Sequence, residues 1–343
     1  MNHERPYELP PIRYRSHLFS MKRLMLALVC SLIGSWAASQ TYPLRPINWV
    51  VPFPPGGSTD LVVRALTEQL SSAWGQAMVI ENKSGAGGGI GAQYVAKAPP
   101  DGYTLLFTTS STHSIAPSLN KNLPYNADTD FLPIVHVANA SHVLLVSKSV
   151  PAKNLKELID HLKKYPGQLN YASSGSGTII HLAAEAFKAD AGLDVVHIPY
   201  KGSTQSISDV ISGKVHLIFD NIVSGMPHAR DGSLTAIAVT SKKRSTLAPE
   251  VPTFMEVGKD YGLGNFQTQT WYGIYAPKGT PTEVIGALNA EVNKALNTPK
   301  MKDKLNFLGA EAVGGTPLQF ANFVKLDKAR WADIIQKNHI IQD

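Results

Sequence analysis

Two short turns made of small residues have the composition of an anion-binding site. The first reads Pro52-Phe53-Pro54-Pro55-Gly56-Gly57-Ser58-Thr59-Asp60 and lies between an apolar run (47–53) and a predicted helix (58–74). Paired glycines let the backbone turn tightly, and the first N–H groups of a helix attract negative charge. We expect Ser58 or Thr59 to cap the helix. Two interpretations of Asp60 stay open: it caps locally, or it accepts a hydrogen bond from a bound molecule.

The second turn repeats this construction. It reads Ser173-Ser174-Gly175-Ser176-Gly177-Thr178, after an apolar run (169–173) and before an apolar helical stretch (178–192). It contains no Lys or Arg, so backbone dipoles and hydroxyl groups would have to bind the anion. Both turns follow predicted strands, and open α/β sheets bind ligands at the carboxyl ends of their strands. Two such turns facing each other across a cleft would hold a small carboxylate.

Short apolar runs alternate with helical stretches along the rest of the chain. The predicted strands are 47–53, 77–83, 103–110, 131–138, 141–149, 169–173, 195–200, 215–221, 234–241 and 271–277. This alternation predicts an α/β fold with mainly parallel sheets flanked by helices. The strands are too many for one small sheet, so we expect two lobes: 41–140 plus 266–343, and 141–265.

Other polar residues at predicted strand ends are candidates for the wall of the cleft. They are Ser110, Thr112, His113, Asn139, Tyr200 and Asp220. His113 has two interpretations, a charge partner for the bound molecule or a purely structural role. Trp271 is expected in the core. The candidate ligand-binding set therefore consists of these six residues, Phe53, residues 55–60 and residues 173–178.

Residues 21–40 have the pattern of a secretory signal peptide. Lys22 and Arg23 precede an apolar run (24–34), and small residues (37–39) follow it. This run is shorter than the roughly 20 residues that a transmembrane helix needs. We therefore expect residues 1–40 to be an N-terminal extension and signal peptide, with translation starting at Met1 or Met21, and the product to be periplasmic.

Composition and failed motifs exclude several function classes. The chain of 343 residues has a net charge of +6 and a single cysteine, so it has no disulfide framework. Its basic residues are scattered, the densest run being 242–244, which argues against a nucleic-acid partner. Residues 87–92 fit a dinucleotide-binding pattern but lack the acidic residue expected about 20 positions later.

The patterns expected for a catalytic serine and for a metal site are also incomplete. Ser176 lacks the flanking glycines of a hydrolase nucleophile, and the pair His181 and Glu185 lacks a third metal ligand. We therefore expect no cofactor, no metal and no enzymatic activity. An exported α/β hydrolase acting on a small carboxylate or ester is the alternative.

Linked motifs resemble the Bug family, the solute-binding receptors of tripartite tricarboxylate transporters. The motifs that carry the resemblance include PFPPGGSTD (52–60), ENKSGAGGGIGA (81–92), PPDGYTLL (99–106), YASSGSGTIIHLAAEAF (171–187) and WYGIYAPKGTP (271–281). The resemblance implies a two-lobed periplasmic binding protein of type II that closes like a Venus flytrap. It implies that residues 53–60 and 173–178 grip a ligand carboxylate.

The resemblance also implies partners. Family ligands are small carboxylates, and the closed receptor would meet transporter membrane subunits or a sensor kinase. We expect a monomer. The stretch TTSSTHS (108–114) departs from the family pattern, so the resemblance does not specify the floor of this pocket.

Overall fold

Strand β4 (Phe131–Ser147) runs through the whole fold of the computed structural model, which describes residues 42–338 and 340, and residues 1, 3, 7 and 8. Its first part pairs antiparallel with β9 (Gln269–Pro277) and β10 (Ala310–Ala312). Its last part pairs antiparallel with β7 (Leu217–Asn221) and β8 (Leu234–Val239). The prediction of two strands, 131–138 and 141–149, is wrong, because pairing with β9 and β10 keeps the residues between them extended.

Three parallel strands lie on each side of β4. The first strand group is β2 (Met78–Asn82), β1 (Ile47–Val51) and β3 (Thr104–Thr109), and the second is β7, β5 (Asn170–Ser173) and β6 (Val196–Pro199). The strand order is β2-β1-β3-β9-β4-β7-β5-β6. The predicted α/β fold is confirmed. The two groups are joined in one sheet, because β4 pairs with β7 of the second group and with β9, which in turn pairs with β3 of the first.

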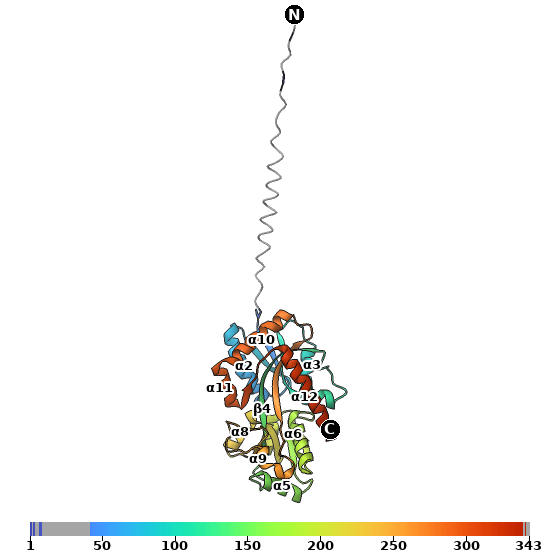
Figure 1. Ribbon diagram of the computed structural model, residues 1–343, viewed down its shortest axis with the longest axis vertical. Helices are drawn as coiled ribbons and strands as arrows, with labels where there is room; N and C mark the ends of the chain where they lie inside the picture. Colours follow the sequence, from blue (N-terminus) through green and yellow to red (C-terminus); the bar gives the residue numbers. More distant parts are fainter. Residues whose placement is uncertain (2, 4–6, 9–41, 339, 341–343) are drawn as a thin grey trace. The chain divides into compact units, whose positions relative to one another are not determined.

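The helices follow from apolar spacing and local caps. In α5 (Leu155–Lys164), Leu155, Leu158, Ile159 and Leu162 recur on one buried face, and Asn154 caps the first turn. Figure 1 shows α2, α3 and α10 beside the first strand group and α5, α6, α8 and α9 beside the second. The remaining helical segments with their bounds are α2 (Ser58–Trp74), η2 (Ala86–Gly88), α3 (Gly89–Ala96), η3 (Ser111–Ile115), α4 (Ala116–Leu119), α6 (Ile179–Ala191), α7 (Ser203–Ile211), α8 (Ile222–Arg230), α9 (Phe254–Val257), η4 (Lys259–Tyr261), α10 (Thr282–Asn297), α11 (Pro299–Leu308) and α12 (Pro317–Lys337).

The C-terminal helix α12 connects the two strand groups a second time. Near its start, Phe320 packs with Trp271 and Tyr275 beside the first group, so the predicted core position of Trp271 is confirmed. Near its end, Trp331 and Ile335 pack in one cluster with residues of β4, α6 and α8. Within the described residues, no helix is both long and apolar enough to cross a membrane. The predicted signal peptide lies almost entirely outside the described residues.

Candidate binding site

Four helices begin at one small cavity between the two strand groups. Residues of the first turns of α2, α6 and α7 line it, as does Asn221, the residue that precedes α8. The free volume is about 20 Å³, little more than one water molecule needs. Among the described residues that line this cavity there is no Lys, Arg or His. They are Phe53, Pro54, Gly57, Ser58, Thr59, Thr109, Ser111, Ser174, Ile179, Ile180, Ser203, Asn221 and Thr270. The helix dipoles and first-turn N–H groups therefore supply the positive potential.

The first turn brings its backbone to the cavity without a side-chain cap. Helix α2 begins at Ser58, and Gly57 precedes it in an extended conformation. The prediction that Ser58 or Thr59 caps the helix is wrong, because both lie inside its first turn and line the cavity instead. Gly56 has a positive φ of 79°, a conformation that favours glycine. The turn thus presents N–H groups that no capping side chain covers.

Asp60 holds this turn in place. Its carboxylate accepts hydrogen bonds from Gly56 N (3.0 Å), Arg64 Nε (2.8 Å) and Asn82 Nδ2 (3.1 Å). Burial raises the pKa of Asp60, but the bonds from Arg64, Gly56 and Asn82 outweigh burial and hold the pKa below its ordinary value. The carboxylate is thus ionised and engaged within its own loop. Of the two interpretations of Asp60, the structure supports the local one.

The second turn is fixed by its own hydroxyl groups. Thr178 caps α6, accepting from His181 N (3.4 Å) and donating to the carbonyl of Gly175 (2.7 Å). Ser173 Oγ accepts from Gly175 N at 3.1 Å. These bonds turn Ser174 toward the cavity, which it lines. Gly175 and Gly177 both have positive φ angles, 129° and 76°, so the turn depends on glycine.

A third turn, η3 after β3, contacts the second across the cavity. Ser111 lines the cavity, and its Oγ accepts a hydrogen bond from Ile179 N, the first residue of α6, at 3.2 Å. Thr112 bonds instead to Thr108 Oγ1 (2.6 Å) and His113 Nδ1 (2.9 Å). Ser110 is fully buried, and among the described residues its hydroxyl has no hydrogen-bond partner.

His113 lies in an aromatic cluster rather than at the cavity. Its ring stacks on Tyr275 with centroids 4.0 Å apart and contacts Phe131 edge-on at 4.8 Å. Burial lowers the pKa of His113 to about 3, so the ring is neutral. Of the two interpretations of His113, the structure supports the structural one, because a charged imidazolium would be unpaired in apolar surroundings.

Asp220 lies directly behind the cavity wall. It is fully buried and accepts hydrogen bonds from Ser203 Oγ (2.9 Å) and Ser224 Oγ (2.6 Å). Burial raises the pKa of Asp220 to about 6, against the hydrogen bonds from Ser224, Ser203 and the Asn221 backbone. Asp220 therefore positions Ser203 and the start of α7.

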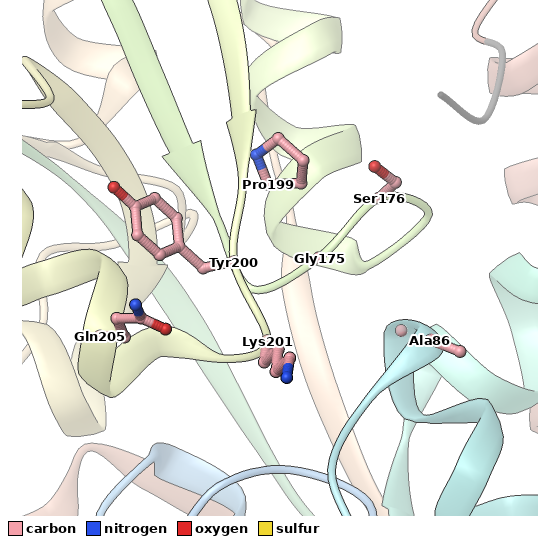
Figure 2. Close-up of a pocket in the computed structure, with 8 residues that line it drawn as sticks. Ala86, Gly175, Ser176, Pro199, Tyr200, Lys201 and Gln205 are labelled. Atoms are coloured by element: carbon pink, nitrogen blue, oxygen red, sulfur yellow. The ribbon is translucent and has the colours of Figure 1, made fainter.

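The two strand groups touch at the mouth of the cavity. Thr204 Oγ1 donates to the carbonyl of Pro55 at 3.1 Å, and Gly202 lies against Pro54. Beside this contact is an opening of about 480 Å³. In Figure 2, the loop with Gly175 and Ser176 and the turn with Ala86 lie on either side of the opening. The Tyr200 ring points away from both, and its hydroxyl donates to Asp209 (2.8 Å). The structure is thus a closed arrangement.

Comparison with known proteins decides the family. A family model described as tripartite tricarboxylate transporter family receptor matches residues 62–340. The chain belongs to this receptor family. BugT of Bordetella pertussis is 36% identical to the chain over 306 residues, which cover 89% of the chain and 93% of BugT. A protein of Pseudomonas sp. strain P51 is 37% identical over 317 residues, 92% of the chain and 93% of the relative.

Solved structures of the family share the fold. The periplasmic binding protein BugD superposes with a TM-score of 0.83 at 36% identity, over 88% of the receptor chain and all of BugD. Rpa4515 of R. palustris, solved with adipate, gives a TM-score of 0.84 at 36% identity, over 88% and 99% of the two chains. MatC from Rhodopseudomonas palustris, with bound malate, gives 0.80 at 33% identity, over 86% and 100%. The receptor described here is therefore a periplasmic solute-binding protein, and the enzyme alternative is not favoured.

Sequence reasoning found some cavity residues of the receptor and missed others. Five of the predicted residues line the cavity: Phe53, Gly57, Ser58, Thr59 and Ser174. Asn139 does not; it lines a different groove and bonds to His136 Nε2 at 2.8 Å. Ser203 and Thr270 line the cavity but were not predicted. The Gly-Ser pair at 202–203, which follows a predicted strand, could have indicated that Ser203 lies at the cavity.

The glycines of residues 87–92 serve packing. A Cβ at Gly91 would lie 2.8 Å from Pro52 Cα, and one at Gly88 would lie 2.7 Å from Thr112 Cγ2. Glycine therefore lets α3 approach the end of β1.

Glu185 accepts a hydrogen bond from Tyr171 OH and one from Lys188 Nζ (2.6 Å). No group of metal-binding side chains occurs among the residues that the structure describes.

Proposed function

We propose that this receptor captures a small carboxylate between residues 53–59 of the first turn and residues 173–178 of the second. The observation that carries the proposal is the convergence of α2, α6, α7 and α8 on a cavity with no cationic side chain among the described residues that line it. A carboxylate is the ligand that several helix N-termini suit. The adipate and malate bound by Rpa4515 and MatC support this ligand class.

Capture requires the two lobes to separate and close again. The cavity of about 20 Å³ is too small for a dicarboxylate, so the ligand would widen it and replace direct contacts such as Ser111 to Ile179. The lobes proposed here are 41–140 plus 266–343 and 141–265, with β4 and β9 as the hinge. A ligand shifts the equilibrium only through its differential affinity for the closed state.

Export and delivery complete the proposal. A cleavable signal peptide within residues 1–40 would direct the receptor to the periplasm. The loaded, monomeric receptor would pass its ligand to membrane subunits of a tripartite tricarboxylate transporter or present it to a sensor kinase. Family membership supports this role, and the chain itself does not specify which partner it meets.

A thermal unfolding assay with matched ligands tests the proposal. Adipate or malate at 100 times its dissociation constant should stabilise the receptor by about 2.7 kcal/mol, and a screen of further mono-, di- and tricarboxylates should include at least one such ligand. Adipamide, the neutral diamide of adipate, is the control and should not stabilise it, because it lacks the negative charge. Stabilisation by adipamide equal to that by adipate, or none by any carboxylate, would contradict the proposal.

A further inference from the structure

A large polar groove lies on the other side of the hinge from the cavity. We call it the hinge groove; it has a volume of about 1000 Å³. Successive residues of a strand face opposite sides, and on β9 Gln269 lines the hinge groove while Thr270 lines the cavity. The loop 240–246 forms one side of the hinge groove, and residues 309–311 with the end of α11 form another. The groove is therefore lined by residues of both proposed lobes.

Cations dominate the hinge groove. Lys242, Lys243, Arg244 and Arg330 line it, and Glu311 is the one acidic residue among the described residues of its lining. Both lysine side chains are exposed. The run 242–244 is also the densest basic run of the sequence. Glu311 and Glu256, which pairs with Arg244, offset two of these four charges, and the net positive charge that remains in a concave surface attracts anions.

The two arginines are held in place. Arg244 Nε donates to both carboxylate oxygens of Glu256 at 3.0 Å, and its Nη1 donates to the carbonyl of Pro249 at 3.0 Å. Arg330 Nη2 donates to the carbonyl of Gln267 at 3.0 Å. Since a guanidinium has five N–H donors, each arginine keeps donors for a ligand. Side chains fixed in advance lose less entropy when they bind.

Neutral donors complete the lining. Asn139 and Asn306 add side-chain amides, which can donate to anionic oxygens. The hydroxyl of Ser241, another lining residue, is shielded from solvent and has no hydrogen-bond partner among the described residues, so it does not face the open groove. Charge, fixed guanidinium donors and amides thus occur together in one concave surface.

We propose that the hinge groove is a second binding site, for a small anion that carries several negative charges, such as a polyphosphate or a polycarboxylate. Lys242 and Lys243 supply mobile charge, Arg244 and Arg330 supply fixed donors, and Asn139 and Asn306 supply amide groups. This site is separate from the cavity between the helix N-termini. It does not depend on which ligand that cavity takes.

Calorimetric titration of the full-length receptor tests the proposal, with inorganic pyrophosphate and citrate as the two probes at one ionic strength. The double variant Lys242→Gln/Lys243→Gln, in which the hinge groove loses two charges, should bind each probe at least about tenfold more weakly than wild type. The matched control is Lys163→Gln/Lys164→Gln, two exposed lysines of α5, and it should bind like wild type. Ser241→Ala should also bind like wild type, because its hydroxyl is shielded from the open groove.

The outcomes separate the explanations. The proposal is supported when the Lys242/Lys243 variant loses affinity and the control variant does not. In that case, tighter binding of pyrophosphate assigns the groove to polyphosphates, and tighter binding of citrate assigns it to polycarboxylates. Equal loss in both double variants means diffuse attraction and overturns the proposal. Binding that neither double variant weakens lies elsewhere on the receptor, and this result, like the absence of saturable binding, also overturns it.

Discussion

Asp60 and Asp220 are buried carboxyl groups beside the same cavity, and their surroundings shift their pKa values in opposite directions. Asp60 accepts bonds from a guanidinium, an amide and a backbone N–H, which together outweigh burial. Asp220 accepts mainly from two serine hydroxyls, which do not outweigh burial. Because each carboxyl group positions a turn that lines the cavity, its protonation affects both stability and the shape of the site.

Replacement of Asp220 by Asn should change how stability depends on pH. The folded protein binds the Asp220 proton more tightly than the unfolded chain, since the pKa rises from 3.8 to about 6. Asp220 therefore stabilises the folded state below pH 4, and this stabilisation is lost as pH rises through 6, which lowers the free energy of unfolding by about 3 kcal/mol. Relative to wild type, Asp220→Asn should gain about 2 kcal/mol in free energy of unfolding between pH 4 and pH 7.5, measured by urea denaturation. Asp303→Asn, at an exposed site on α11, is the control and should show no such gain.

Replacement of Asp60 by Asn should have the opposite pH dependence. A lowered pKa stabilises the folded state above the unfolded pKa, and this contribution disappears as pH falls through the folded value. Asp60→Asn should cost about 2 kcal/mol at pH 7, and the difference from wild type should shrink toward pH 3. It should also weaken carboxylate binding, because asparagine keeps only one acceptor oxygen for the donors of Gly56, Arg64 and Asn82 that hold the turn. A difference that stays constant with pH, measured by urea denaturation, would contradict the assigned role.

At the scale of elements, the turn before α7 limits how closely the lobes can approach. Gly202 has an extended backbone, φ 171°, which any residue can adopt. A Cβ at Gly202, however, would lie 2.3 Å from Pro54 Cδ, across the mouth of the cavity. The requirement for glycine therefore comes from the closed arrangement and not from the local conformation. The turn at Gly177 is different, since its positive φ of 76° requires glycine locally.

The variant Gly202→Ala should bind carboxylates more weakly without losing stability. The added methyl group collides with Pro54 only when the lobes are closed, so the unliganded protein can relax by opening. Calorimetry with adipate or malate, whichever binds, should show a loss of affinity, and the melting temperature without ligand should stay near that of wild type. Gly286→Ala on α10, where no atom lies within 4 Å of the new Cβ, is the control and should bind like wild type. Wild-type affinity in Gly202→Ala would rule out this closure contact.

At the scale of the whole molecule, β4 and α12 make the two strand groups one structure. Strand β4 pairs with β7 of the second group and reaches the first group through β9, and the end of α12 packs against residues beside the second. In the proposed hinge, two connections of this kind would permit rotation but resist full separation. On β9, Thr270 lines the cavity and Gln269 lines the hinge groove, so such a rotation would affect both.

Removal of the α12 contact should destabilise the receptor as a whole. Trp331 is 1% exposed and packs with Val143 and Met226. Trp331→Ala should therefore cost about 3–5 kcal/mol in free energy of unfolding, by urea denaturation. Leu326→Ala is the control on the same helix; its side chain is 72% exposed, and the change should cost under about 0.5 kcal/mol. A small effect of Trp331→Ala would mean that α12 contributes little to joining the groups.

Local patterns were enough for most strands, most helices and the two glycine turns. The alternation of apolar runs predicted β1, β3, β5 and β7, and the turn composition predicted Phe53, Gly57, Ser58, Thr59 and Ser174 at the cavity. The sequence did not reveal that 131–149 is mostly one strand, because strand continuity depends on hydrogen bonds to β9 and β10, which are distant in sequence. For the same reason the sequence did not show that Asn139 lies outside the cavity.

The sequence by itself determined the α/β class, the two glycine turns and, through linked motifs, the family. These depend on periodicity, on glycine and on residue order, which are local properties of the chain. Only the tertiary structure decided that Asp60 is engaged within its own loop, that His113 lies in an aromatic cluster, and that α7 and α8 also point at the cavity. The physical reason is that burial, hydrogen-bond partners and the convergence of helix dipoles arise between elements distant in sequence, so no local pattern encodes them.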